Sequence, residues 1–160
     1  MVKYLEEMPR LANKRLLAFL LSVLFLLACG EVSTPSRIDI LDAVQETGKY
    51  TTKDSVAAYI HKFQKLPSNY VNKAAGQALY EERTGDVWTK WNFNPWKVLG
   101  VMIGGDYFSN NEGLLPIGNY KECDVDYHDS SRGTKRLIYT NAGLVYYTAN
   151  HYESFTSIYE

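Results

Sequence analysis

Three short runs of alternating residues near the C-terminus limit the folds open to this chain more than any other part of its sequence. The runs cover residues 120–127, 135–140 and 144–148. Successive side chains of a β-strand point to opposite faces, so Cys123 belongs to an apolar face of the first run, while Glu122 and Asp124 belong to an acidic one. The turn-like segments between the runs predict an antiparallel sheet, in which Glu122, Arg136 and His151 meet on one polar surface.

Length and composition fit one globular domain that follows a targeting segment. The chain has 160 residues, and its 13 tyrosines suit a half-buried sheet whose polar tips reach solvent. The formal net charge is −1. Overall charge therefore predicts no polyanionic partner, and any anion site must come from a local cluster of cations.

The N-terminal segment has the pattern of a lipoprotein-type signal peptide, which we assign to residues 1–28. Lys14 and Arg15 precede an apolar run that is short for a membrane span and suits a signal h-region. The run ends in Leu26-Leu27-Ala28-Cys29-Gly30, which resembles a bacterial lipobox with Cys29 as the lipidated residue. The alternative is an uncleaved N-terminal anchor in which Cys29 is incidental. Both interpretations place the rest of the chain outside the cell, either secreted or anchored at the cell surface.

The remainder is predicted to divide into a tether and a folded domain. We assign residues 29–49 to the tether and residues 50–160 to the domain. A short periodic run of Ile38, Leu41 and Val44 predicts one weak helix within the tether.

Cysteine usage points away from disulfides and metal sites. If Cys29 carries lipid, Cys123 is the one cysteine left, and no metal-binding spacing is present. We therefore expect no metal and no cofactor. Cys123 could act as a nucleophile beside His151, but strand alternation places it on the face opposite Glu122, which favours a small buried hydrophobe.

Two helices are predicted at the start of the domain. Thr52 can cap the first, whose apolar residues recur at helical spacing until Leu66-Pro67 stops it. Asn72 caps the second, and Gly85 lies beyond its end. Lys73 then lies in the first turn, where the helix dipole disfavours a cation but free N–H groups favour a phosphate. Lys73 is a candidate phosphate ligand, with a solvated surface lysine as the alternative.

All three tryptophans, Trp88, Trp91 and Trp96, lie in the Pro-interrupted stretch 86–102. They could form a stacking platform for bases or sugars. They could also pack a short helix and loop onto the domain, which is the usual role of large aromatic side chains.

Residues 103–116 combine paired glycines, two asparagines and a further glycine, which predicts a tight loop with unusual backbone angles. Glu112 stands in this loop as an ionised acceptor. Guanine presents N1–H and the N2 amino group side by side, and one carboxylate can accept from both. The stretch is therefore a candidate guanine-binding loop.

A set of short strings, ordered along the chain, carries a resemblance to a known family. The strings are Lys65-Leu-Pro-Ser-Asn-Tyr70, Lys73, Gln77-Ala-Leu79, Ile103-Gly-Gly-Asp-Tyr-Phe-Ser-Asn110, Glu112-Gly113, Leu115-Pro116, Glu122, Arg132, Arg136-Leu-Ile-Tyr139 and His151-Tyr152. From about residue 54 to residue 158, the chain resembles the small secreted bacterial ribonucleases of the barnase and binase family.

The resemblance implies an α+β fold in which N-terminal helices pack on a twisted antiparallel sheet of about five strands. It also implies metal-free cleavage of single-stranded RNA after guanosine, through a 2′,3′-cyclic phosphate. In this interpretation Glu122 is the general base and His151 the general acid. The cations Lys73, Arg132 and Arg136 hold the phosphate and stabilise the transition state. The carboxylates Asp106 and Asp124 orient these groups.

The same resemblance assigns a base-binding site and reveals four departures from the family. The site residues are Phe108, Ser109, Asn110, Asn111, Glu112 and Tyr152. Asn111 stands where the family usually has arginine, which removes a positive charge beside the base. The segment between Pro116 and Glu122 is shorter than usual, and the tryptophan-rich stretch is longer. The domain is also less basic, with 11 lysines and arginines against 12 aspartates and glutamates from Tyr50 onward.

The expected partners also come from the resemblance. They are single-stranded RNA and a barstar-like protein inhibitor, with membrane contact only through lipidated Cys29, and the protein is expected to be a monomer. Two other functions stay open: a catalytically inactive barnase-like lipoprotein that binds a ligand, and a toxin ribonuclease aimed at competitor cells. No functional role is expected for His61 or His128.

Overall fold

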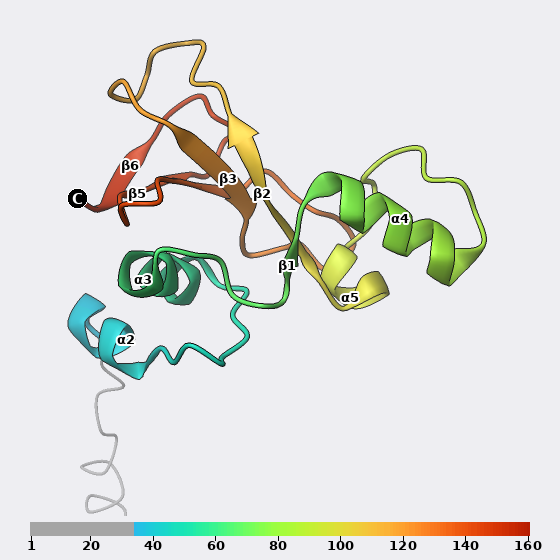
Figure 1. The fold of residues 1–160 in the computed structure, drawn as a ribbon, viewed down its shortest axis with the longest axis horizontal. Helices are drawn as coiled ribbons and strands as arrows, with labels where there is room; N and C mark the ends of the chain where they lie inside the picture. The colour runs from blue at the N-terminus through green and yellow to red at the C-terminus, as the bar shows by residue number, and fades with distance from the viewer. Residues whose placement is uncertain (1–33) are drawn as a thin grey trace, which may run out of the picture. The chain divides into compact units, whose positions relative to one another are not determined.

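The computed structural model describes residues 34–160, of which Pro35–Glu160 form one compact unit. The predicted signal peptide and Cys29 lie outside the described residues. In chain order the elements are α2 (Arg37–Ala43), α3 (Lys53–Phe63), β1 (Tyr70–Val71), α4 (Lys73–Thr84), α5 (Pro95–Leu99), β2 (Met102–Phe108), β3 (Tyr120–Asp124), β4 (Arg136–Tyr139), β5 (Val145–Thr148) and β6 (Thr156–Tyr159) (Figure 1). No helix in this described part is long and apolar enough to cross a membrane.

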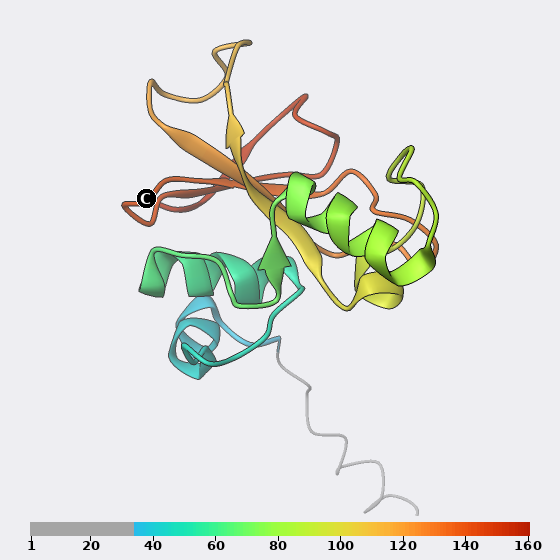
Figure 2. The same ribbon diagram turned by 45° about the vertical axis from the view of Figure 1, so that its right-hand side comes forward.

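The six strands form one sheet in sequence order. β1 runs parallel to β2, and every other neighbouring pair is antiparallel. Figures 1 and 2 show α2 and α3 on one side of the sheet, with α4 and α5 beside the start of β2. The predicted α+β class is confirmed, with six strands in place of about five.

Strand β3 ends at Asp124, three residues before the end of the predicted run. Asp126 takes a left-handed conformation with φ 48°, which turns the chain out of the sheet. Its Oδ1 accepts a hydrogen bond of 3.0 Å from the backbone N–H of Lys53, the first residue of α3. Thr52 occupies the N-cap position as predicted, but its side chain makes no capping hydrogen bond. A residue far along the chain therefore caps this helix.

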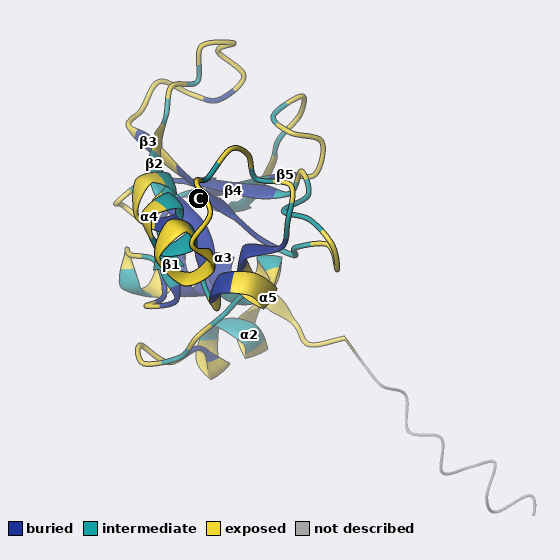
Figure 3. Cartoon of the chain, turned by 90° about the vertical axis from the view of Figure 1, so that its right-hand side faces the viewer, coloured by how far each residue is buried: buried dark blue, intermediate teal, exposed yellow. Residues whose placement is uncertain are grey.

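Helix α3 covers one face of the sheet and supplies four of the eleven buried residues of the main core. Val56, Ala57 and Ile60 are completely buried against Val125 and Val145 of the sheet region. Burial of a large aliphatic side chain contributes about 1.5–3 kcal/mol, so this layer stabilises the domain. Figure 3 shows β4 buried along its length, while the outer surfaces of α4 and α5 are exposed. The helix ends at Phe63, earlier than the predicted stop at Leu66-Pro67.

Cys123 is 1% exposed and belongs to this main core. Burial raises the pKa of its thiol well above the ordinary value, so the thiol stays protonated. The structure therefore favours the buried hydrophobe over the nucleophile.

A second, smaller apolar cluster lies on the opposite face of the sheet. Leu137 and Tyr139 join the main core, whereas Ile138 between them joins the second cluster with Leu115 and Tyr120. Alternation along β4 explains this division. The second cluster supports the face that is free of helix α3.

The segment before α3 packs onto the domain through α2 and Val44. A capping box between Ser36 and Asp39 begins α2, which confirms the helix predicted in this segment. Val44 is 3% exposed and lies in the main core. Arg37 donates a 2.6 Å hydrogen bond to the carbonyl of Ile158 in β6.

Helix α4 has the predicted ends. The Asn72 side chain accepts from the backbone N–H of Ala75 at 2.8 Å, and Gly85 closes the helix with φ 76°. Beyond it, the rings of Trp88 and Trp91 contact each other with 5.3 Å between their centroids, whereas Trp96 is 38% exposed. For Trp88 and Trp91, this arrangement favours packing onto the domain over an open stacking platform.

The paired glycines lie in strand β2 and not in the predicted loop, which begins only after Phe108. Gly105 has φ 98°, and the register between β2 and β3 shifts at this point. Gly104 packs directly on Cys123, where a β-carbon would collide. The glycines therefore allow a bulge and a close strand contact.

Candidate active site

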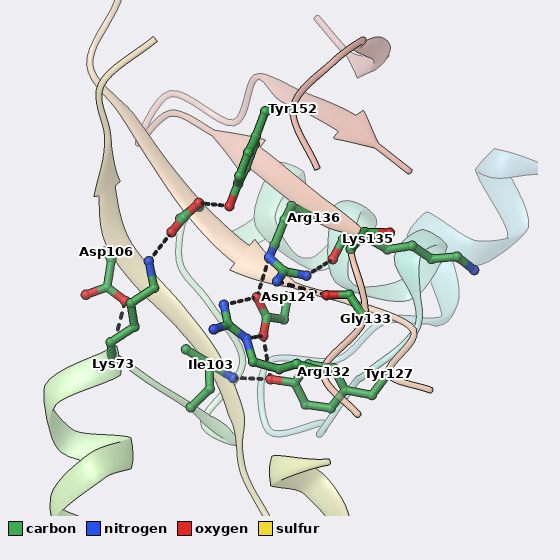
Figure 4. A network of polar contacts seen from close by, with 12 residues as sticks. Lys73, Ile103, Asp106, Asp124, Tyr127, Arg132, Gly133, Lys135, Arg136 and Tyr152 are labelled. Carbon is green, nitrogen blue, oxygen red and sulfur yellow. Dashed lines mark hydrogen bonds and ion pairs between the residues drawn. The ribbon is translucent and has the colours of Figure 1, made fainter. Parts of the chain in front are cut away.

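Glu122 lies at the centre of the polar surface that β3 presents on the free face of the sheet. It is 7% exposed. Its Oε1 accepts a hydrogen bond from Lys73 Nζ at 2.5 Å, and its Oε2 accepts one from the Tyr152 hydroxyl at 2.5 Å (Figure 4). Two distant segments, one on each side of the carboxylate, therefore hold it in place.

The environment of Glu122 favours its ionised form. Burial raises the pKa of the carboxyl group, but hydrogen bonds from Lys73 and Tyr152 and the charges of Lys73 and Arg136 outweigh burial. The pKa therefore lies below the ordinary value of 4.5. At neutral pH the group is a carboxylate that can accept a proton.

Helix α4 begins at Lys73, which binds Asp106 of β2 and Glu122 of β3. Asp106 Oδ2 accepts a 3.0 Å hydrogen bond from the backbone N–H of Lys73 (Figure 4). Asp106 also lies opposite Glu122 in the register of β2 and β3. Because 41% of the Lys73 side chain is exposed, it remains accessible to a ligand.

Asp124 anchors both arginines of the predicted phosphate site. Its side chain is 2% exposed, and it accepts hydrogen bonds from Nε and Nη2 of Arg132, the latter at 2.9 Å. Arg136 Nε lies 2.7 Å from Asp124 Oδ1 in an ion pair that lacks hydrogen-bond geometry. The Tyr127 hydroxyl donates to Asp124 Oδ2 at 2.8 Å and accepts from the N–H of Ile103 (Figure 4). One buried carboxylate thus organises two cations and a phenol.

The two arginines differ in what their outer nitrogens bind. Arg136 donates through Nη1 to the carbonyl of Lys135 at 2.7 Å and through Nη2 to that of Gly133 at 3.1 Å. Within residues 34–160, no hydrogen bond from Nη1 of Arg132 is found. Arg132 therefore has a nitrogen free for an external acceptor, while Arg136 acts mainly through its charge.

His151 lies in an exposed turn beside Tyr152. Its φ is 57°, and its ring centroid is 4.6 Å from that of Tyr152. The Thr148 hydroxyl accepts from the N–H of Tyr152 at 3.0 Å and donates to Asn150 Oδ1, which holds the turn. Tyr152 therefore contacts both proposed proton-transfer residues, Glu122 through its hydroxyl and His151 through its ring.

A pocket of about 460 Å³ adjoins His151. Its lining residues are Phe108, Ser109, Glu112, Leu114, His151, Tyr152 and Glu153. Asn110, with φ 49°, binds the backbone of Leu115 through both side-chain polar atoms, at 2.9 and 3.1 Å. Its side chain therefore shapes the loop, and Glu112 is the carboxyl side chain that this loop places in the pocket wall.

Comparison with known proteins gives the family. A family model described as ribonuclease matches residues 53–159. The ribonucleases of Bacillus intermedius and Bacillus pumilus are both 36% identical, over 82% and 76% of this chain and 77% and 73% of their own lengths. The ribonuclease of Heyndrickxia coagulans is 38% identical over 67% of this chain and 95% of its own length. This chain belongs to the ribonuclease family.

The resemblance to barnase- and binase-type ribonucleases is therefore confirmed, and the protein is an RNA-cleaving enzyme. The ribonuclease brings together the predicted residues Lys73, Glu122, Tyr152 and His151 through direct contacts. Asn111 is not among the residues that line the pocket.

Sequence reasoning missed three contributors to the site of this ribonuclease. Leu114 and Glu153 line the pocket, and Tyr127 supports Asp124. Glu153 directly follows the His151-Tyr152 pair, which is the one local signal that points to it. Tyr127 carries no such signal, because its role depends on the chain leaving the sheet at Asp126. In residues 34–160, no cluster of three or more His, Cys, Asp or Glu side chains is placed to hold a metal ion.

Proposed function

We propose that this ribonuclease is an extracellular endonuclease that cleaves single-stranded RNA on the 3′ side of guanosine without a metal ion. The reaction is a transesterification that leaves a 2′,3′-cyclic phosphate. The observation that carries the proposal is the ionised Glu122 carboxylate, held between Lys73 and Tyr152 with His151 beside Tyr152.

The chemistry divides between Glu122 and His151. Glu122 takes the proton of the ribose 2′-hydroxyl, and the 2′-oxygen forms a bond to phosphorus. The bond from phosphorus to the 5′-oxygen breaks, and the departing oxygen takes a proton from the imidazolium of His151. Glu122 is deprotonated and His151 is protonated, so one can accept a proton while the other donates one during cleavage.

The cations beside Glu122 fit a phosphate in the transition state. Lys73 is partly exposed, and Nη1 of Arg132 makes no hydrogen bond to any of residues 34–160, so both can donate to phosphate oxygens. Arg136 adds charge at a fixed position because its outer nitrogens are bound to backbone carbonyls. Groups that are already fixed in place stabilise developing charge without reorganisation.

The pocket beside His151 fits a purine that offers hydrogen-bond donors. Glu112 and Glu153 both line it, and Phe108 and Tyr152 supply apolar walls with ring centroids 5.3 Å apart. Guanine has two adjacent hydrogen-bond donors, N1–H and the N2 amino group, and one carboxylate can accept hydrogen bonds from both. Adenine lacks this pair of donors. Guanine is therefore the preferred base.

RNA digestion in EDTA tests the proposal. Wild type should cleave and leave guanosine 3′-ends, and Glu122→Ala and His151→Ala should each lose about a hundredfold or more in kcat/KM. A Glu112→Gln variant should lose guanine preference while still cleaving. Activity that needs a metal ion, or that survives both catalytic substitutions, would overturn the mechanism.

The proposed location is the cell exterior, with lipid on Cys29. Metabolic labelling of producing cells with a radioactive fatty acid should mark the wild-type protein and not Cys29→Ser. Label on the Cys29→Ser protein would reject the anchor without affecting the proposed chemistry.

A further inference from the structure

The tryptophan-rich stretch reaches the proposed phosphate site through Trp91. The guanidinium carbon of Arg132 lies over the Trp91 ring, 5.6 Å from its centroid. The Arg132 side chain is only 12% exposed, so the guanidinium is largely shielded from water. A cation over an indole face is attracted by the ring quadrupole, and the attraction grows where water is excluded.

Arg132 lacks the backbone contacts that fix Arg136. Asp124 binds its Nε and Nη2, and Nη1 has no hydrogen bond within residues 34–160. Arg136, by contrast, has two carbonyl acceptors on its outer nitrogens. The Trp91 indole is therefore a second contact, besides Asp124, that holds the Arg132 guanidinium while Nη1 stays available to a ligand.

Trp91 itself is held firmly. Its ring contacts Trp88 and Phe93, with centroid distances of 5.3 and 5.6 Å. It also lies against Gly76 of α4, where an added β-carbon would be 3.0 Å from the Trp91 ring and 2.7 Å from Ile103. Because the absence of a side chain at Gly76 makes room for the indole, the helix and the aromatic cluster together define its position.

We propose that Trp91 is a positioning residue that holds Arg132 in the orientation in which Nη1 binds the scissile phosphate. This inference rests on the proposed function, because it takes Arg132 as a phosphate ligand. Trp91 does not touch the substrate in this proposal. It limits the rotamers of Arg132, so that the guanidinium is already placed when the phosphate arrives.

Replacement of Trp91 tests the proposal in the full chain. Trp91→Leu removes the ring but keeps an apolar side chain, and Trp91→Phe keeps a ring. Trp91→Leu should lower kcat/KM for a guanosine dinucleotide by about tenfold and weaken inhibition by inorganic phosphate by a similar factor. Trp91→Phe should stay within about threefold of wild type in both measurements.

Trp88→Phe is the matched control. Trp88 packs on Trp91, but its buried Nε1 has no hydrogen-bond partner among residues 34–160, so phenylalanine leaves none of their acceptors unpaired. This variant should keep wild-type kinetics. Urea unfolding of each variant separates loss of the folded protein from loss of the Arg132 contact.

The Arg132→Ala background distinguishes positioning from general packing. Trp91→Leu should have no further effect on kcat/KM or on phosphate inhibition once Arg132 is absent. An equal loss in both backgrounds, or unchanged kinetics of folded Trp91→Leu, would overturn the role of Trp91 and leave the proposed function standing. Failure of wild type to cleave the dinucleotide would overturn both.

Fluorescence gives an independent readout. Since the chain has three tryptophans, the double variant Trp88→Phe/Trp96→Phe leaves Trp91 as the sole emitter. Inorganic phosphate should change its emission, and Arg132→Ala should abolish the change. Emission that does not respond to phosphate at concentrations that inhibit cleavage would count against the contact.

Discussion

The hydroxyl of Tyr152 donates a 2.5 Å hydrogen bond to Oε2 of Glu122. The resemblance to known ribonucleases assigned Tyr152 only to the base-binding site, whereas this contact makes it part of the environment that keeps Glu122 ionised. The same tyrosine lies against His151. The base and the acid of the proposed reaction are therefore linked through one aromatic side chain.

Tyr152→Phe should move the acid limb of the kcat/KM profile to higher pH. Glu122 must be ionised to act as a base, and loss of a hydrogen bond to the carboxylate raises its pKa. The pH at half-maximal kcat/KM should therefore rise. Tyr107→Phe, at a side chain that is 70% exposed, is the control and should leave this midpoint unchanged. A midpoint for Tyr152→Phe that coincides with wild type would contradict the proposed link.

Glu122→Gln should alter the pH dependence of stability as well as activity. The pKa of Glu122 is lowered in the folded protein, so its ionisation contributes stability above the unfolded-state pKa. That contribution disappears as the pH falls through the folded-state pKa. Urea unfolding should therefore show that wild type loses more stability than Glu122→Gln between about pH 7 and pH 3. Parallel curves for the two proteins would reject this assignment.

Asp124→Asn should destabilise the domain by about 3–5 kcal/mol, because it leaves two arginines without their buried counter-charge. Urea unfolding measures the loss. Asp129→Asn is a matched control, because Asp129 pairs with Lys97 and its own side chain is fully exposed to solvent. The unfolding midpoint of this variant should equal that of wild type. Similar midpoints for the two variants would show that Asp124 does not organise the site.

Gly76→Ala should destabilise the protein although alanine is the better helix former by about 1 kcal/mol. The added β-carbon meets Ile103 at 2.7 Å and Trp91 at 3.0 Å, and overpacking of this kind costs about 1–3 kcal/mol. Thermal unfolding should show a lower Tm. Glu82→Ala, at an exposed position of the same helix, should show no decrease. A higher Tm for Gly76→Ala would mean that the indole can move away without cost.

His151→Asn and His151→Ala should lose activity to a similar extent but differ in stability. The backbone at His151 is left-handed, with φ 57°, a conformation that asparagine adopts more readily than alanine. His151→Asn should therefore be more stable than His151→Ala by about 1 kcal/mol in urea unfolding. The reverse order would show that this turn does not retain its conformation in the variants.

Local patterns were enough to predict the caps of α4, the positions of β4 and β5 and the burial of Cys123. These features depend on neighbours in sequence or on simple alternation. The exit of the chain from β3 at Asp126 was not predictable in this way, because its carboxylate caps a helix 73 residues earlier. The paired glycines of β2 were wrongly predicted to lie in a loop, because glycine is common both in loops and at close contacts between strands. Only the packing of Gly104 on Cys123 shows which of the two applies here.

The candidate site shows the same division. The ordered family strings predicted Glu122, His151 and the cations as site residues, whereas the contacts of Tyr127 with Asp124 and of Trp91 with Arg132 are tertiary. Tyr127 was expected in the first β-run, where alternation puts it on the apolar face. Its hydroxyl reaches Asp124 only because the strand has already ended.

The contact of Arg37 with the carbonyl of Ile158 has a consequence for the exposed edge of the sheet. β6 is the last strand of the sheet, and an edge strand offers unpaired backbone groups to any passing chain. The Arg37 guanidinium donates a hydrogen bond to one of those groups, the carbonyl of Ile158. Its central carbon lies over the Tyr159 ring, 5.4 Å from the ring centroid. The segment that precedes α3 thereby leaves one fewer backbone acceptor of β6 open to pairing with the edge of another sheet.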